Sequence, residues 1–202
     1  MKFKTIEILD GDNWLTIQVS NDYPGTWEND IYYQRLTYFD AIKLAHDNDC
    51  ELATAKIEDL CWEHANIRLP AFPSGPPYTS MDGQKAYQKI SDKILEAFPV
   101  SKTCHGLPDL SEQDLAAGHK KVMVLSQKAI KAKKLAIYGW HGTSGKPIQG
   151  LSLAHSLDYS DYSQSARFVK NLMVLDGKEI TYKEILKDPK LYKMVSNEKI
   201  IL

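Results

Sequence analysis

Cysteine is scarce in this sequence of 202 residues, and that scarcity excludes two common architectures. The three cysteines are Cys50, Cys61 and Cys104. An odd and low number argues against a framework of disulfide bonds. The CxxC spacing of a thiolate zinc site is also missing.

Long apolar runs and an excess of charge of one sign are absent as well. No apolar run approaches the roughly 20 residues that span a bilayer, and residues 1–6 lack the hydrophobic stretch of a signal peptide. We therefore expect no membrane span and no export by the usual route, and the sequence indicates no compartment. The 25 basic and 26 acidic residues give a net charge of −1, so nucleic acid is not an expected partner.

What is present is the composition of a folded domain. Hydrophobic residues make up 43% of the chain and charged residues 25%, which allows a sizeable core, and the length fits a single domain over residues 1–202. Apolar and polar residues alternate on both sides of a turn at 10–13, which predicts an N-terminal β-hairpin. Helical periodicity indicates helices over 38–47, 54–65 and 82–98, the second capped by Thr54.

The second half of the chain changes in character. Residues 121–125, 135–140 and 166–175 form β-rich runs, and 181–194 reads as one or two short helices. We therefore predict an α+β fold, with an N-terminal β-hairpin, helices in the first half and a mainly antiparallel sheet in the second.

Residues 118–162 hold the densest collection of chemically active side chains. His119 follows a glycine at the start of a strand-like run, and histidine exchanges protons near neutral pH. His141 ends another such run between glycines, with Tyr138 beside it as a candidate hydrogen-bond donor. The alternatives are a histidine that only hydrogen-bonds a loop and a tight hairpin that buries Trp140 in the core.

His155 and Asp161 lie in a stretch rich in Asp, Tyr and Ser. Imidazole and carboxylate groups can bind zinc or another divalent ion. The HExxH and HxH spacings are missing, however, and an ordinary surface loop has the same composition. The presence of a metal is therefore left open, and no other cofactor is indicated.

Cys50 is a candidate from another part of the chain. It precedes the helix capped by Thr54, and a helix dipole lowers the pKa of a nearby thiol. With His119 as the base, Cys50 would form a Cys-His hydrolase. The alternative is a buried, apolar cysteine.

The order of elements resembles the papain-like cell-wall hydrolases of the NlpC and CHAP type. The phrases ANIRLP at 65–70 and LAIY at 135–138 carry this resemblance. The cysteine position of those enzymes falls on Thr54 here, and their histidine position falls near Lys134. The resemblance therefore implies the fold more than the activity.

Four motifs resemble a family of largely uncharacterised bacterial proteins, over about residues 38–197. They are AGHKK at 117–121, AIYGWH at 136–141, GKPIQ at 145–149 and DYS at 161–163. His155 and Arg167 continue the pattern, whereas Gln164 stands where the family has a histidine. The resemblance implies a shared site without naming a reaction, and many members of the family look exported.

Two functions follow as hypotheses. The first is a hydrolase acting on a small molecule or on cell-wall peptide or glycan, in which His119 is the general base or a ligand. Its other site residues would be Tyr138, His141, His155 and Asp161. The second is a non-catalytic binding or structural protein whose aromatic recognition surface would be formed by Tyr138, Trp140, Tyr159 and Tyr162. Convergence of the histidines in one cleft would favour the enzyme, and separate hydrogen bonds would favour the binding protein.

Overall fold

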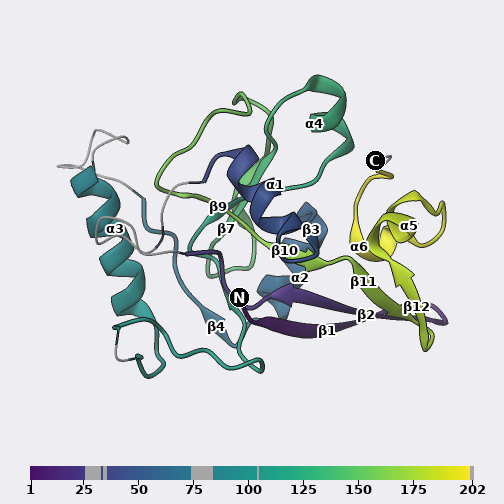
Figure 1. Cartoon of the computed structure of the whole chain (residues 1–202), viewed down its shortest axis with the longest axis horizontal. Coiled ribbons are helices and arrows are strands. Elements are labelled where there is room, and N and C mark those ends of the chain that lie inside the picture. The colour runs from purple at the N-terminus through teal and green to yellow at the C-terminus, as the bar shows by residue number, and fades with distance from the viewer. Residues whose placement is uncertain (26–32, 34–35, 74–83, 104, 201–202) are drawn as a thin grey trace.

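A computed structural model of the chain describes residues 1–25, 33, 36–73, 84–103 and 105–200. The fold is α+β and begins with a β-hairpin, as predicted (Figure 1). Within the described part of the chain, no helix is long and apolar enough to cross a membrane.

The N-terminal hairpin pairs β1 (Phe3–Asp10) with β2 (Asn13–Ser20) in antiparallel register. Alternate residues of both strands face the core, where Ile6, Leu15 and Ile17 are almost fully buried. Burying one such side chain contributes about 1.5–3 kcal/mol, so this alternation fixes which face of the hairpin turns inward.

The hairpin belongs to a six-stranded sheet in the order β12-β11-β2-β10-β3, with β1 paired to β2. The added strands are β3 (Cys50–Leu52), β10 (Phe168–Lys170), β11 (Leu172–Leu175) and β12 (Lys178–Thr181). The β11–β12 turn has positive φ at Asp176 (50°) and Gly177 (79°), as a two-residue Asp-Gly hairpin requires.

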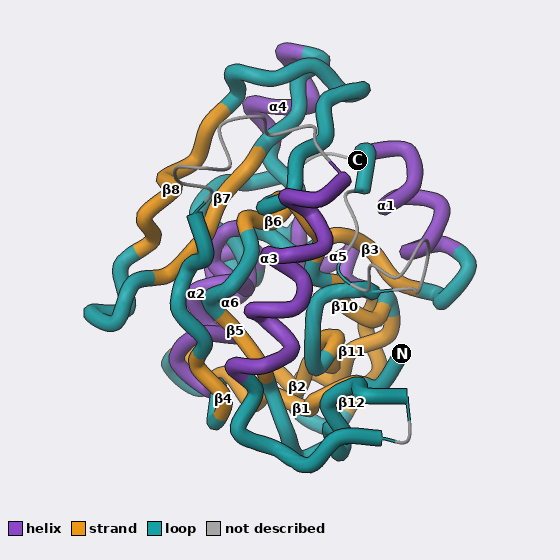
Figure 2. Tube along the Cα trace, turned by 90° about the vertical axis from the view of Figure 1, so that its left-hand side faces the viewer, coloured by secondary structure: helices purple, strands orange, loops and turns teal. Residues whose placement is uncertain are grey.

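A second, four-stranded sheet has the order β8-β7-β6-β9, and its strands β6, β7 and β8 lie above those of the first sheet in Figure 2. Its strands are β6 (Lys121–Met123), β7 (Ile137–His141), β8 (Pro147–Ser152) and β9 (Gln164–Ala166). Pairing in both sheets is antiparallel except between β6 and β9. A short parallel pair, β4 (Ile67–Arg68) with β5 (Ala116–Ala117), completes the described strands.

Six helices occur in the described residues. They are α1 (Tyr38–His46), α2 (Ala55–His64), α3 (Gln84–Ala97), α4 (Gln127–Ala132), α5 (Tyr182–Lys187) and α6 (Tyr192–Val195). Thr54 caps α2 as predicted, because its hydroxyl accepts the Ile57 N–H. Helix α2 contacts β5 and β7, while α3 stands at the left-hand side of the molecule in Figure 1 and therefore faces the viewer in Figure 2.

The helices cover the sheets through separate apolar clusters. One cluster joins the N-terminal hairpin to α2, α5 and α6. A second joins α3 to β4 and β5, and a third joins α1 to β3, β9 and β10. Helix α2 belongs to the first cluster, and the two residues of β5 are divided between the first cluster and the second.

Candidate functional site

Parallel pairing of β6 with β9 brings two of the sequence motifs together. His119 and Lys120 immediately precede β6, and residues 161–163 immediately precede β9, with Lys121 opposite Gln164 in the register. The Lys120 ammonium nitrogen donates to the Tyr162 carbonyl at 2.7 Å. The AGHKK and DYS segments therefore lie side by side at one end of the sheet.

Trp140 fixes the backbone of this region from β7. Its N–H donates to the Lys120 carbonyl at 3.1 Å, and its indole Nε1 donates to the His119 carbonyl at 3.2 Å. Trp140 has φ of 57°, an uncommon conformation for a non-glycine residue. Strain of this kind persists where the surrounding contacts enforce it, and these two hydrogen bonds anchor the backbone of His119 and Lys120.

His119 is closed off from solvent. Its side chain has no exposed surface, and its Nε2 lies 3.3 Å from Asp22 Oδ1. The edges of three aromatic rings enclose it, with centroid distances of 4.7, 5.3 and 5.7 Å to Tyr23, Tyr33 and Phe98. Burial lowers the pKa of His119, and the Asp22 carboxylate opposes part of that effect. The imidazole is therefore neutral near pH 7.

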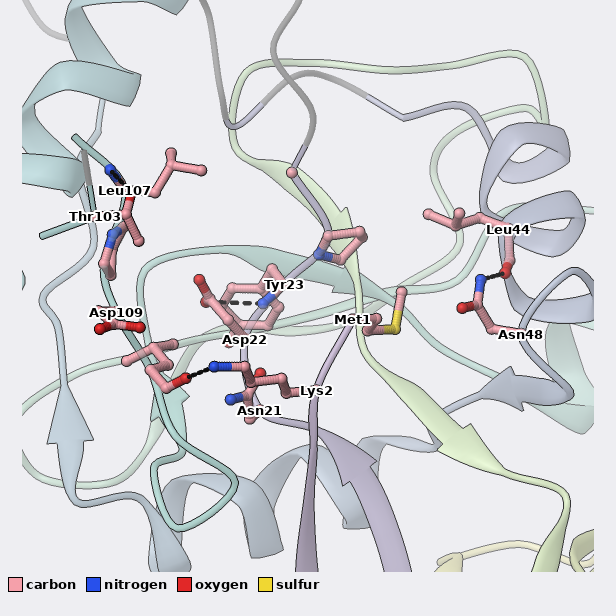
Figure 3. A pocket seen from close by; sticks show the side chains of 14 residues that line it. Met1, Lys2, Asn21, Asp22, Tyr23, Leu44, Asn48, Thr103, Leu107 and Asp109 are labelled. Carbon is pink, nitrogen blue, oxygen red and sulfur yellow. Dashed lines mark hydrogen bonds between the residues drawn. The ribbon is translucent and has the colours of Figure 1, made fainter. Parts of the chain in front are cut away.

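Asp22 lies between His119 and a cavity of about 430 Å³. Its Oδ1 accepts the Tyr23 N–H at 2.8 Å, and its Oδ2 accepts the Tyr33 hydroxyl at 2.5 Å. Figure 3 shows side chains that line the cavity around Asp22 and Tyr23, among them Leu44, Asn48, Thr103, Leu107 and Asp109. The Asp22 side chain keeps 13% of its surface exposed, so a ligand in this cavity can reach Asp22 but not His119.

Lys120 is the second buried titratable group of the site. Its side chain is 1% exposed, and its Nζ lies 5.5 Å from the centroid of the Tyr33 ring. Burial lowers the pKa of Lys120 to about 7, although the negative charges of Asp161 and Asp22 oppose the shift. Lys120 therefore changes charge near neutral pH, which is rare for lysine.

Arg167 and Glu58 form a buried ion pair close to the site. Arg167 Nε lies 3.2 Å from Glu58 Oε2, and neither side chain has exposed surface. The Arg167 guanidinium also donates to the carbonyls of Ser20 and Ala116 at 2.7 and 2.8 Å. Charge pairing and hydrogen bonding together offset the cost of burying the two charges.

His141 belongs to a different cluster. Its Nε2 lies 2.9 Å from Asp59 Oδ1, which also accepts the Tyr138 hydroxyl at 2.7 Å. The imidazole stacks on the Trp62 ring at 5.4 Å with an interplanar angle of 13°. His141 is fully buried, whereas Asp59 keeps 35% of its side chain exposed. As in the pair of Asp22 with His119, the carboxylate is exposed to solvent and the imidazole is not.

His155 and Asp161 make a third set of contacts. His155 stacks on the Tyr159 ring at 3.6 Å, and the Tyr159 hydroxyl donates to Asp161 Oδ2 at 2.9 Å. Burial raises the pKa of Asp161, but hydrogen bonds from Ser163 and Tyr159 and the charge of Lys121 outweigh it and hold the pKa below its usual value. The carboxylate therefore stays ionised and organises its own loop.

The three candidate histidines thus have separate partners, which are Asp22, Asp59 and Tyr159. The expectation that His141 and His155 would assist His119 finds no direct contact in these geometries. Among the residues that the structure describes, no group of three or more His, Cys, Asp and Glu side chains could hold a metal ion.

Cys50 has surroundings opposite to those expected of a nucleophile. It lies in β3 and packs into the cluster beneath α1, with no exposed surface. Burial raises the pKa of the Cys50 thiol to about 11. The expected lowering by the dipole of α2 is therefore wrong, because desolvation dominates. Cys61 is buried with its pKa raised to about 12, and Cys104 lies outside the described residues.

The four aromatic residues expected to form a recognition surface pack against different clusters. Tyr162 is only 4% exposed and shares its cluster with Trp140, while Tyr159 and Tyr138 pack elsewhere. Gln164, at the position of the family's histidine, is buried and donates to the carbonyls of Leu36 and Tyr159. That side chain therefore joins the segment before α1 to the loop that precedes β9.

Sequence reasoning missed Asp22, Asp59 and Glu58. Asp22 sits in a segment with a strong turn signature, and Glu58 and Asp59 sit on what reads as the polar side of a helix. Their partners are far along the chain: Asp59 and His141 are 82 positions apart, and Glu58 and Arg167 are 109 positions apart. The one local hint is a pair of adjacent carboxylates in a helix with aromatic and cysteine neighbours, which is too weak to place them.

Comparisons with protein-family models, with curated proteins and with solved structures find no match to this chain. The two resemblances drawn from its motifs therefore stay predictions.

Proposed function

We propose that this chain is a hydrolase in which the Asp22 carboxylate transfers the proton. The buried His119 imidazole assists Asp22 from the side that faces away from the cavity. One observation carries the proposal: Asp22 lines the cavity, and the buried imidazole of His119 lies 3.3 Å from its Oδ1. A buried histidine of lowered pKa in contact with a carboxylate that lines a cavity is an arrangement typical of active sites. The proposal transfers the role of general base from His119 to Asp22.

The chemistry is general base catalysis of water attack. Asp22 accepts a proton from a water molecule, whose oxygen attacks the carbonyl carbon of an ester or amide. The proton then passes to the departing alcohol or amine, so the reaction consumes one water and needs no other reactant. Tyr33 and the Tyr23 N–H hold the carboxylate in place, and neutral His119 can share the proton that Asp22 accepts.

The substrate class to test first is a cell-wall peptide, because its amide bonds have the carbonyl carbon that the water attacks. The motif resemblances suggest it, and a cavity of about 430 Å³ has the volume of a small-molecule site. Peptidoglycan and a panel of small esters and amides, each with and without zinc, make up the assay.

Asp22→Asn should lower kcat/KM by roughly 100- to 10,000-fold, because the amide cannot accept the proton. The matched control is Asp109→Asn, which removes a second carboxylate that lines the same cavity. We expect that variant to stay within a few-fold of the unmodified protein. Equal activity of Asp22→Asn and the unmodified protein would exclude Asp22 as the base, and inactivity of the unmodified protein on the whole panel would count against a hydrolase.

A second candidate is a binding protein without catalysis. The specific observation that favours it is the separation of the histidines, since His119 and His141 are each buried against one carboxylate. Contacts of this kind can serve only to hold segments together. Saturable binding of a wall fragment that is lost in Asp22→Asn, with no turnover by either protein, would favour this function over the first.

A further inference from the structure

Tyr23 contacts both members of the Asp22–His119 pair. Its backbone N–H donates to Asp22 Oδ1 at 2.8 Å, the same oxygen that faces the His119 imidazole. Its hydroxyl accepts the Gly118 N–H at 3.3 Å, and Gly118 directly precedes His119. The edge of the Tyr23 ring also packs against the imidazole at 4.7 Å.

The hydroxyl of Tyr23 joins segments that are distant in sequence. It donates to Glu58 Oε1 at 2.5 Å, across 35 residues, while accepting from Gly118 across 95 residues. This buried phenol therefore both donates and accepts a hydrogen bond. The hydroxyl fixes the segment that carries Asp22 relative to α2 and to the segment that carries His119.

The buried ion pair holds Tyr23 itself. The Arg167 guanidinium lies over the Tyr23 ring at 4.2 Å, and Arg167 pairs with the same Glu58 that accepts the phenol proton. Tyr23 is 2% exposed, so no water competes for these contacts. The Tyr23 ring therefore lies between the ion pair and the imidazole.

We infer that Tyr23 is a positioning residue that holds the Asp22 carboxylate against the His119 imidazole. The importance of Tyr23 for turnover rests on the proposed function. The coupling between Asp22 and His119 does not depend on that function. The charged and titratable groups that face His119 are Asp22, Tyr23, Tyr33, Lys120 and Arg167. Of these, Asp22 is the one whose charge raises the histidine pKa.

Tyr23→Phe keeps the ring and removes the hydroxyl. We expect the Asp22–His119 contact to loosen, and the midpoint of the His119 titration, followed by NMR of the imidazole, to fall by about 0.5 to 1 pH unit. Tyr182→Phe is the matched control, because Tyr182 is also fully buried but belongs to the cluster around α5. That variant should leave the His119 midpoint unchanged even if it alters stability.

An unchanged His119 midpoint in folded Tyr23→Phe overturns the inference. If Tyr23→Phe does not fold, the test uses the unmodified protein. We then expect the NMR chemical shift of the Tyr23 amide to change with pH at the same midpoint as His119. A Tyr23 amide shift that does not change at that midpoint also overturns the inference. These readouts need no substrate. Failure of the hydrolase proposal would appear as inactivity on the panel, whereas failure of this inference would appear in the titration alone.

Discussion

Lys120 lies beside His119 with its side chain removed from solvent, and its position has a measurable consequence for stability. In the unfolded chain its pKa is 10.5, and in the folded protein it is about 7. Between these values the unfolded chain binds more protons, so the free energy of unfolding rises with pH across this window. Below pH 7 the cost of burying the charged group is present in full.

We therefore predict that Lys120→Met flattens the dependence of stability on pH. The difference in unfolding free energy between Lys120→Met and the unmodified protein should narrow by about 2 kcal/mol from pH 7 to pH 9. Urea unfolding at the two pH values measures it. Lys146→Met removes an exposed lysine next to β8 and should leave the slope unchanged. A slope in Lys120→Met equal to that of the unmodified protein would contradict the shifted pKa.

At the scale of single residues, the sequence singles out His119 by local signals, which are the glycine before it and the strand that follows. The structure buries this side chain 3.3 Å from Asp22. Asp22 carries no such signal, because an aspartate before Tyr-Pro-Gly reads as part of a turn. Its role depends on which surface the end of β2 packs against, and that packing is set by Arg167 and Glu58 far along the chain.

Among the elements, those with clear periodicity and local caps are the ones that sequence predicts. The N-terminal hairpin, α1 and α2 are confirmed, because alternation and the Thr54 cap are contained within each segment. The strands β3, β4 and β5 are two or three residues long. Such segments are too short for any periodicity, and only pairing with distant partners makes them strands.

The segment between β5 and β6 packs against α2 at a distance that only glycine allows. A Cβ on Gly118 would lie 2.3 Å from the Leu69 carbonyl oxygen and 2.6 Å from Trp62 Cζ3, and φ is +103°. Close packing and the positive φ both exclude a side chain. Trp62 also stacks on His141, so displacement of its ring would reach the second cluster.

We predict that Gly118→Ala lowers the free energy of unfolding by about 3 kcal/mol or more, since both overpacking and backbone strain add to the cost. Two controls separate these terms in chemical denaturation. Gly177→Ala has positive φ but open space around it and should cost about 1 kcal/mol. Gly150→Ala has open space without positive φ and should be nearly neutral. A Gly118→Ala cost no larger than that of Gly177→Ala would argue against tight packing on α2.

For the molecule as a whole, Arg167 occupies the joint between the two sheets. It is the single residue between β9, in the four-stranded sheet, and β10, in the six-stranded sheet. Its side chain reaches Glu58 of α2, the Ser20 carbonyl at the end of β2 and the Ala116 carbonyl of β5. The buried guanidinium therefore links α2, the six-stranded sheet and the β4–β5 pair, while the backbone of Arg167 connects the four-stranded sheet to the six-stranded one.

Loss of either charge of this pair should destabilise the whole fold. We expect Arg167→Met and Glu58→Gln each to lower the free energy of unfolding by about 3–5 kcal/mol, because each leaves the other charge buried without its partner. The double variant should cost less than the sum of the two, since it leaves no unpaired charge. The exposed pair Lys43–Asp47 serves as the control cycle, and its coupling should be close to the experimental error.

Unfolding followed by tryptophan fluorescence and by far-UV circular dichroism should give coincident transitions in every variant. Two separate transitions would mean that the sheets unfold independently and that Arg167 does not join them into one cooperative unit.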